Sequence, residues 1–398
     1  MRHQKRSAYA ILFAFMLISL AIPVAGQDAT GRGGRIFFPV VLSHPAQAPN
    51  LPPPDSPELR VVVAESIPSG AAYAALAYWT ADRMAQARPL DLAAVVTAPA
   101  EGLRDREEPV AGGAAPSYGG LPGAASLAAE LYAADWAAAS AASERNAASE
   151  SEVVETTGVD AWSTSPPFTS YYVNDNADLW KSFPWRTVGR LFFNRPLTPG
   201  AFSCSGAVGV GRAVWTAGHC VYTPGEGFNK NMIFVPAYRN GAKPYGAFAV
   251  LSRATLRGWT GGKAAFDLGM LAVADVNNLK VSDWVGNLGF RYNAASTQLL
   301  HFAGYPDRIG RSQFLIACST VTNRREPLEG PDPIGVGCDM DGGADGAPGL
   351  SAFAPNKSGA VNYVNSIFSH VAPATPNLLY GVYFDTGAKG LYDWGKAQ

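Results

Sequence analysis

Three separated stretches of the chain carry side chains suited to proton transfer. His219 lies in the phrase Thr-Ala-Gly-His-Cys, Asp267 opens an apolar run, and Asp345 lies on the glycine-rich stretch 342–349. A histidine can take a proton from a nucleophile, and a buried aspartate can fix its tautomer. A glycine-rich turn can direct backbone N–H groups toward the anion that forms in acyl transfer. Alone, such a turn is typical of a polar surface loop, but the three together favour a catalytic scaffold.

Short strands must position these residues. From about residue 185 the sequence forms brief apolar runs bounded by Gly, Pro or Asn, a pattern typical of all-β sandwiches and barrels. The predicted strands are 188–193, 207–210, 213–216, 232–236, 248–251, 268–274, 300–304, 314–319, 350–353, 361–368 and 379–384. A short helix over 388–396 is expected to pack against the second barrel through Leu391, Tyr392 and Trp394.

Four motifs resemble one family. The phrases T-A-G-H-C at 216–220, D-L-G-M-L at 267–271, H-F-A-G-Y-P at 301–306 and C-D-M-D-G-G-A-D-G-A-P at 338–348 are similar to those of the trypsin-like serine endopeptidases. The nearest likeness is to secreted bacterial members and glutamyl endopeptidases. The resemblance covers residues from about 185 to the end and implies two six-stranded antiparallel barrels. It also implies that His219 is the base and Asp267 the acid of a triad.

The nucleophile loop departs from the family. Its relatives read like C-D-M-T-G-G-S-S-G-G-P, so Asp345 stands where the serine is expected, and a slipped register places Gly346 there instead. Neither register supplies a hydroxyl. The resemblance implies oxyanion-hole N–H groups from Gly343 and residue 345. We expect the Asp345 carboxylate to form an ion pair with His219, and we interpret Ser351 as a barrel residue rather than a displaced nucleophile.

All four cysteines, at 204, 220, 318 and 338, lie in the peptidase-like region. Three pairings are possible, and the resemblance implies bridges Cys204–Cys220 and Cys318–Cys338. Zinc is the competing interpretation of clustered Cys and His, but the spacings fit none of the usual ligand patterns. We expect no metal and no cofactor.

The N-terminal part has a different composition. Residues 1–26 have a basic start and an apolar run ending in small residues, which predicts a secretory signal peptide, with an uncleaved anchor as the alternative. Residues 27–58 are a proline-rich tether, 59–165 an alanine-rich extension or propeptide, and 166–398 the trypsin-like domain. We predict proteolytic trimming between about 148 and 185.

Charge narrows the possible partners. The net charge is −1, and no basic run with interleaved aromatics follows residue 10, so nucleic acid is an unexpected partner. We expect a secreted monomer that contacts a polypeptide substrate or protein ligand, and no membrane after signal removal. Two functions stay open: a catalytically silent binding module, or an active or weakly active endopeptidase. We interpret His370 as an exposed loop histidine rather than one that recognises glutamate.

Overall fold

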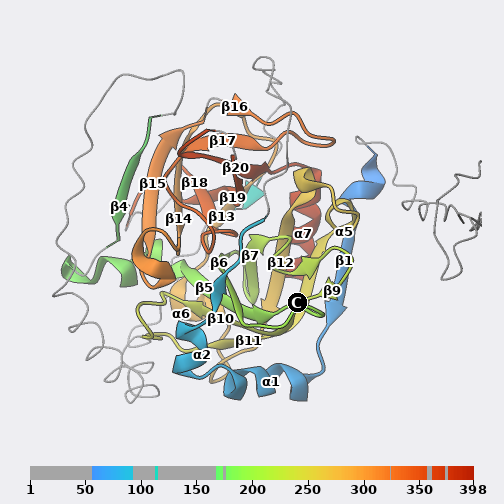
Figure 1. Cartoon of the computed structure of the whole chain (residues 1–398), viewed down its shortest axis with the longest axis vertical. Helices are drawn as coiled ribbons and strands as arrows, with labels where there is room; N and C mark the ends of the chain where they lie inside the picture. The colour runs from blue at the N-terminus through green and yellow to red at the C-terminus, as the bar shows by residue number, and fades with distance from the viewer. Residues whose placement is uncertain are drawn as a thin grey trace, which may run out of the picture. The chain divides into compact units, whose positions relative to one another are not determined.

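The computed structural model describes residues 56–92, 113–114, 167–173, 176–322, 324–355, 361–372 and 375–398. The predicted signal peptide, nearly all of the tether and most of 93–166 lie outside these residues. Two large antiparallel sheets make up the described part (Figure 1). In that part, no helix has both the length and the apolar character needed to cross a membrane.

The first sheet closes into a barrel of six strands. In ring order these are β11, β10, β5, β6, β7 and β12, and β12 pairs back onto β11. Their bounds are β5 (Val188–Asn194), β6 (Phe202–Val208), β7 (Ala213–Ala217), β10 (Lys230–Pro236), β11 (Phe248–Leu256) and β12 (Leu268–Val273). Trp215, Phe234 and Phe248 are fully buried. The near-continuous apolar character of these strands therefore reflects burial on both faces.

The second sheet curls without complete main-chain closure. Six strands follow in the order β17 (Ile334–Gly337), β20 (Leu378–Tyr383), β19 (Tyr363–Val371), β18 (Pro348–Ser351), β14 (Leu299–Gly304) and β15 (Ile316–Val321). No main-chain pairing joins β15 to β17 among the described residues. These two strands are instead connected by the disulfide Cys318–Cys338 and by a hydrogen bond of 3.3 Å from Gly337 N to Thr320 Oγ1. The predicted all-β class with two antiparallel barrels of six strands is confirmed, the first as a closed barrel and the second as a curled half-barrel.

Short elements complete the described part. The helical turns are η1 (Pro57–Arg60), η2 (Asn176–Lys181), η3 (Trp185–Thr187), α5 (Arg257–Thr260), η4 (Ala264–Phe266), α6 (Val281–Val285) and η5 (Gly310–Ser312). The remaining short strands include β8 (Tyr222–Thr223), β9 (Gly227–Phe228), β13 (Gly289–Arg291) and β16 (Arg324–Arg325).

Segments that precede the barrel in sequence are built into it. β1 (Val62–Ser66) pairs antiparallel with β11, and β2 (Arg88–Pro89) runs parallel to β6. Between them lie α1 (Ser69–Tyr78) and α2 (Ala81–Ala85). The second sheet gains β3 (Gly113–Ala114) against β13 and β4 (Thr169–Tyr172) against β15. Leu59, Trp79 and Met84 are buried in the core. Residues 56–92 are therefore an integral layer of the first barrel.

The predicted C-terminal helix is α7 (Thr386–Lys396). The Asp385 side chain caps it by accepting a hydrogen bond of 2.7 Å from Gly387 N. The expected packing against the second barrel holds only for Tyr392, whose ring stacks on Phe290 of β13, 4.7 Å between centroids. The helix otherwise packs on the first barrel, where a Cβ on Gly395 would lie 2.3 Å from Met270 Sδ of β12. Two glycines at 387 and 395 allow this close approach to the first barrel.

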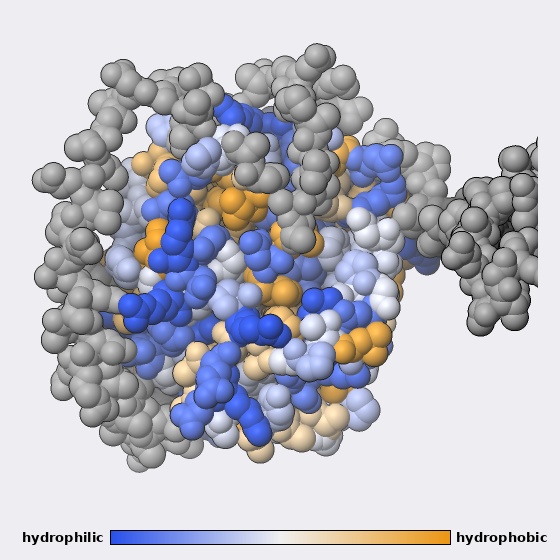
Figure 2. All heavy atoms as spheres, in the orientation of Figure 1, coloured by the Kyte–Doolittle hydropathy of each residue, from blue (hydrophilic) through white to orange (hydrophobic). Residues whose placement is uncertain are grey.

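Hydrophobic residues on the face seen in Figure 2 occur singly or in small groups among hydrophilic ones. The bulk of the apolar side chains forms a core that both sheets share. Such scattered exposure is ordinary for a folded domain. This face therefore shows no large apolar patch among the described residues, and the core common to both sheets holds most of the apolar side chains.

Candidate active site

His219 and Asp267 meet because of strand register. His219 follows the end of β7, and Asp267 directly precedes β12. These neighbouring strands pair Ala217 with Leu268. The residues that extend beyond this pair are therefore adjacent, although 48 positions separate them in sequence.

Asp267 orients the histidine through two hydrogen bonds. Its Oδ1 accepts from the His219 backbone N at 2.7 Å, and its Oδ2 contacts His219 Nδ1 at 2.8 Å. Both side chains are buried. Holding Nδ1 in this way leaves Nε2 as the nitrogen able to take a proton from a neighbouring group.

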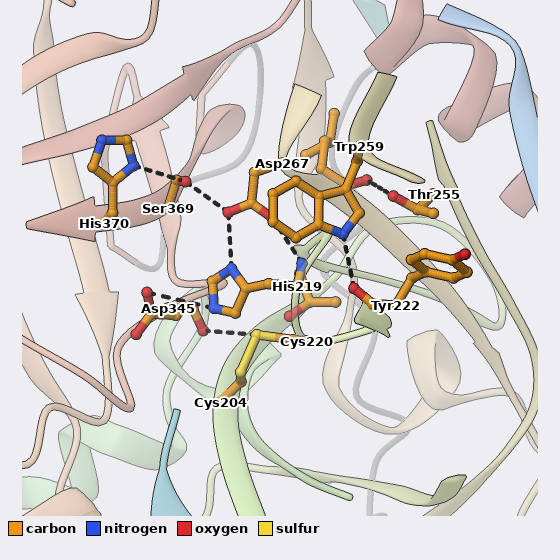
Figure 3. A network of polar contacts seen from close by, with 12 residues as sticks. Cys204, His219, Cys220, Tyr222, Thr255, Trp259, Asp267, Asp345, Ser369 and His370 are labelled. Atoms are coloured by element: carbon orange, nitrogen blue, oxygen red, sulfur yellow. Dashed lines mark hydrogen bonds and ion pairs between the residues drawn. A yellow bond between two sulfur atoms is a disulfide. The ribbon is translucent and has the colours of Figure 1, made fainter. Parts of the chain in front are cut away.

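A third residue, Ser369 on β19, extends this arrangement into the second sheet. Its Oγ donates to Asp267 Oδ2 at 2.6 Å. Behind it, His370 Nδ1 lies 3.0 Å from the same Oγ, and His370 Nε2 lies 2.9 Å from Glu326 Oε2. Figure 3 shows the line from His370 through Ser369 and Asp267 to His219. A polar network thus runs from Glu326 to the candidate base.

The exposed position predicted for His370 is wrong. Its side chain is fully buried and Glu326 is 1% exposed. Since the Ser369 hydroxyl donates to Asp267, it accepts from His370 Nδ1, while His370 Nε2 faces Glu326 Oε2. His370 therefore has an internal carboxyl partner, which satisfies a polar pair that would be costly to bury alone.

The glycine-rich loop 342–348 docks tightly on β6. Ser205 N donates to Asp345 O at 2.8 Å, and Ser205 Oγ donates to Gly343 O at 2.8 Å. Gly346 has φ +88°, and a Cβ there would lie 2.2 Å from Ser205 O. Only glycine fits that position, so the sequence pattern of the loop has a direct steric cause.

Asp345 points at the candidate base. Its Oδ1 lies 3.6 Å from His219 Nε2, longer than a hydrogen bond, and the side chain is fully buried (Figure 3). Neither carboxyl oxygen has a hydrogen-bond partner among the described residues, and neither has His219 Nε2. His219 Nε2 and the two carboxyl oxygens of Asp345 therefore lie close together without a hydrogen bond among the described residues.

The electrostatics of Asp345 oppose the ion pair expected from the sequence. Burial, reinforced by the nearby Asp91 and Asp267, raises the pKa of Asp345 well above its usual value. The backbone N–H groups of Asp345 and Gly343 lower the pKa in part, although neither makes a well-formed hydrogen bond to the carboxyl. The neutral acid is thus favoured over a carboxylate paired with imidazolium.

The predicted oxyanion donor Gly343 is already engaged. Its N–H donates to Leu90 O at 3.1 Å. A Cβ on Gly342 would lie 3.0 Å from Asp91 Cβ, so the chain passes directly over the loop there. Residues 90 and 91 belong to the N-terminal extension, and sequence reasoning did not place them at the site.

Both predicted disulfides, Cys204–Cys220 and Cys318–Cys338, are present. The first fastens β6 to the segment that carries His219, and the second fastens β15 to the start of the nucleophile loop. Ser351, the rejected nucleophile candidate, donates weakly to Tyr363 O at 3.4 Å within the sheet. Its hydroxyl takes no part in the site.

No model of a protein family matches the chain. The extracellular metalloprotease of Bacillus subtilis is 29% identical over 117 residues, which are 29% of this chain and 36% of the relative. The chain thus spans about a third of that curated relative.

Among solved structures, the protease Anisep from Arthrobacter nicotinovorans is similar at 27% identity and TM-score 0.48, covering 54% of this chain and 96% of that one. A thermostable serine protease from an extremophilic microorganism has 26% identity and TM-score 0.47, with 54% and 98% covered.

The described residues do not fit the metal that one relative's name implies. The groups whose ligand atoms lie close enough for one ion are Cys204, His219 and Cys220, and Cys318, Cys338 and Asp339. In both groups the two sulfurs are joined to each other, so neither offers thiolate ligands.

The resemblance predicted from the motifs is confirmed at the level of the fold. A closed barrel and a second curled sheet bring together His219, Asp267 and the loop of Asp345 in the chain order of trypsin-like serine peptidases, and a short helix ends the chain. The chain has a trypsin-like peptidase scaffold.

Proposed function

We propose that this chain is an exported, catalytically silent homologue of the trypsin-like serine peptidases that binds extended polypeptide at the site of His219. The observation that carries the proposal is the position of Asp345, with Oδ1 3.6 Å from His219 Nε2. That is the place from which a nucleophile would deliver its proton to the base. A carboxyl group stands there instead of a hydroxyl.

A carboxyl group at this position is a poor replacement for serine. Attack by its oxygen on a peptide carbonyl would form an anhydride, which gains no stability over the amide. Loss of the nucleophile from a triad lowers turnover by about a millionfold. Binding does not need the nucleophile, so a polypeptide ligand remains compatible with this scaffold.

Export is supported by the two disulfides, which persist in oxidising compartments. The basic and apolar start of the sequence fits a secretory signal. We infer a monomeric extracellular protein without nucleic-acid or lasting membrane contact.

A weakly active endopeptidase is the second candidate. It is favoured by the intact hydrogen bonds from the His219 backbone N and Nδ1 to the Asp267 carboxyl, at 2.7 and 2.8 Å. Such an enzyme would need a hydroxyl or a water molecule in place of the Asp345 carboxyl.

Phosphonate labelling and one substitution separate these candidates. Purified wild type is expected to leave a serine-directed phosphonate probe and fluorogenic peptides unchanged, whereas Asp345→Ser gains both labelling and turnover. Asp345→Ala is the matched control, because it removes the same carboxyl without adding a hydroxyl. Stoichiometric labelling of the wild type would refute the silent assignment. A folded but inert Asp345→Ser variant would show that more than the nucleophile is missing.

A further inference from the structure

The chain supplies its own extended strand to the site. Arg88 N donates to Ala201 O, and Leu90 N donates to Ser203 O, each at 2.9 Å. In Figure 1 this blue stretch leaves α2 and runs beside β6. Adding a strand to a sheet edge is a recurrent way of binding peptides, because main-chain hydrogen bonds supply the affinity. We call residues 88–92 the inserted segment.

The inserted segment is held on its other side by the nucleophile loop. Gly343 N donates to Leu90 O, and Gly342 lies against Asp91. The segment therefore bridges the first barrel and the loop through main-chain groups. Because these contacts involve backbone atoms, another peptide in the same conformation could make them equally well.

Alternate side chains of the inserted segment pack inward. Leu90 and Leu92 are half-buried against the shared core, whereas Asp91 between them is more exposed. This alternation is that of an extended strand with one buried face. Buried Arg190 supports the approach, donating to Ser203 Oγ at 2.9 Å and to Ala87 O at 3.4 Å.

The site beside the inserted segment is buried. His219 is 4% exposed and Asp345 is fully buried, and Asp91 of the inserted segment lies near enough for its charge to raise the pKa of Asp345. Two cavities of the described part, of about 290 and 320 Å³, are lined by other residues. Because the Gly343 N–H already donates to Leu90 O, a polypeptide ligand that accepts from this N–H must take the place of the inserted segment.

We propose that the inserted segment is an internal ligand, and that an extended peptide with apolar side chains at alternate positions binds the same surface of β6 and Gly343 by displacing it. This inference rests on the proposed function, because it names the ligand class and the regulation of that site. A site that is open only part of the time has its apparent affinity reduced by the open fraction. Weakening the internal strand should therefore strengthen binding of an external one.

A competition experiment on the full chain tests the proposal. The probe is a fluorescein-labelled hexapeptide copying residues 87–92, and binding is followed by fluorescence anisotropy. Leu90→Pro removes the N–H that bonds Ser203 O, so this variant should bind the probe about tenfold more tightly than wild type, as expected for one lost hydrogen bond of 1–1.5 kcal/mol. A control hexapeptide with serine at both leucine positions should bind at least about tenfold more weakly than the probe.

A second, milder variant keeps the test valid if Leu90→Pro does not fold. The Arg88 guanidinium is exposed, donates to Pro199 O at 3.0 Å and lies over the Phe202 ring. Arg88→Ala should keep the fold and give a smaller gain in probe affinity in the same direction. Thermal unfolding followed by tryptophan fluorescence establishes that both variants are folded.

Hydrogen exchange supplies a readout independent of any ligand. The Gly343 amide should exchange slowly in wild type and at least about tenfold faster in Leu90→Pro. Equal probe affinity in wild type and both folded variants, or unchanged Gly343 exchange, would overturn the internal-ligand proposal. Neither result depends on whether the protein labels with a phosphonate, so failure here is distinguishable from failure of the silent assignment.

Discussion

The two halves of the candidate site differ in how completely their polar atoms are bonded. Around Asp267, the backbone N and Nδ1 of His219 and the hydroxyl of Ser369 all contact the carboxyl within 2.6 to 2.8 Å. Around Asp345, both carboxyl oxygens and the facing His219 Nε2 have no partner among the described residues. The half that would orient a base is complete, and the half that would attack is not.

The complete half has a structural task that does not depend on catalysis. Asp267 joins the first barrel to the second sheet, because its partners His219 and Ser369 belong to different sheets. An unbonded carboxyl there would incur the full cost of desolvation. In the described part of the chain the Asp345 side chain makes no hydrogen bond, so no link between the two sheets depends on it.

The largest effect on kcat is expected when the candidate base His219 is removed from the Asp345→Ser variant. In an Asp345→Ser background, His219→Ala should lower kcat for a fluorogenic peptide at least about a thousandfold, because triad members act as a unit. Steady-state kinetics measure the loss. Retained activity in the folded double variant would show that the hydrolysis comes from another group or from a contaminating peptidase.

The disulfide at the start of the nucleophile loop is the next target. Replacing Cys318 and Cys338 together with alanine opens a link across 20 residues and should lower the free energy of unfolding by about 3 kcal/mol. Urea unfolding measures this difference. The matched pair is Cys204 and Cys220, which span 16 residues and should cost a similar amount. If only the loss of Cys204–Cys220 lowered the free energy of unfolding, the disulfide Cys318–Cys338 would be dispensable for closing the second sheet.

The unpaired Asp345 should give a pH-dependent stability. The pKa of Asp345 in the folded chain lies well above the ordinary value of 3.8. At pH values between the unfolded-state pKa and the folded-state pKa, the folded state therefore binds more protons than the unfolded state. The free energy of unfolding therefore falls as pH rises through that window, and below it the difference vanishes.

Asp345→Asn cannot titrate and is similar in size. The difference between the Tm of Asp345→Asn and the Tm of wild type should be smallest near pH 4 and should increase in favour of the variant toward pH 8. Calorimetry across that range measures the trend. A constant offset at all pH values would mean that Asp345 is ionised in the folded chain.

Most of the fold could be predicted from the sequence because its strands are apolar runs with clear breakers. The strand predicted over 188–193 is β5, and that over 268–274 is β12 with one residue too many. β17 was missed because two of its four residues are glycine, which weakens a strand pattern. β1 was missed because it lies in an alanine-rich region that favours helix. Its pairing with β11 depends on contacts with a segment far away in the sequence.

The site was predictable only where a local motif marked it. His219, Asp267 and Asp345 each lie in a recognisable phrase, and the structure brings them together. The contacts of Ser369 with Asp267 and of Leu90 with Gly343 join segments more than 100 residues apart. No periodicity or spacing signals such contacts, because they follow from how the strands are docked.

The smallest effect concerns the link between the two sheets. Ser369→Ala in the Asp345→Ser background removes the hydroxyl that donates to Asp267 Oδ2 at 2.6 Å. Losing one hydrogen bond to a charged group costs about 1.5 kcal/mol, so kcat should fall about tenfold. KM should stay unchanged, because Ser369 acts on the orientation of the base through Asp267. Ser366→Ala is the matched control: it removes a buried hydroxyl of the same strand that donates to Val382 O, away from Asp267, and it should leave kcat unaltered. An equal loss in both variants would mean that the strand had merely loosened, and the orienting half would then extend no further than His219 and Asp267.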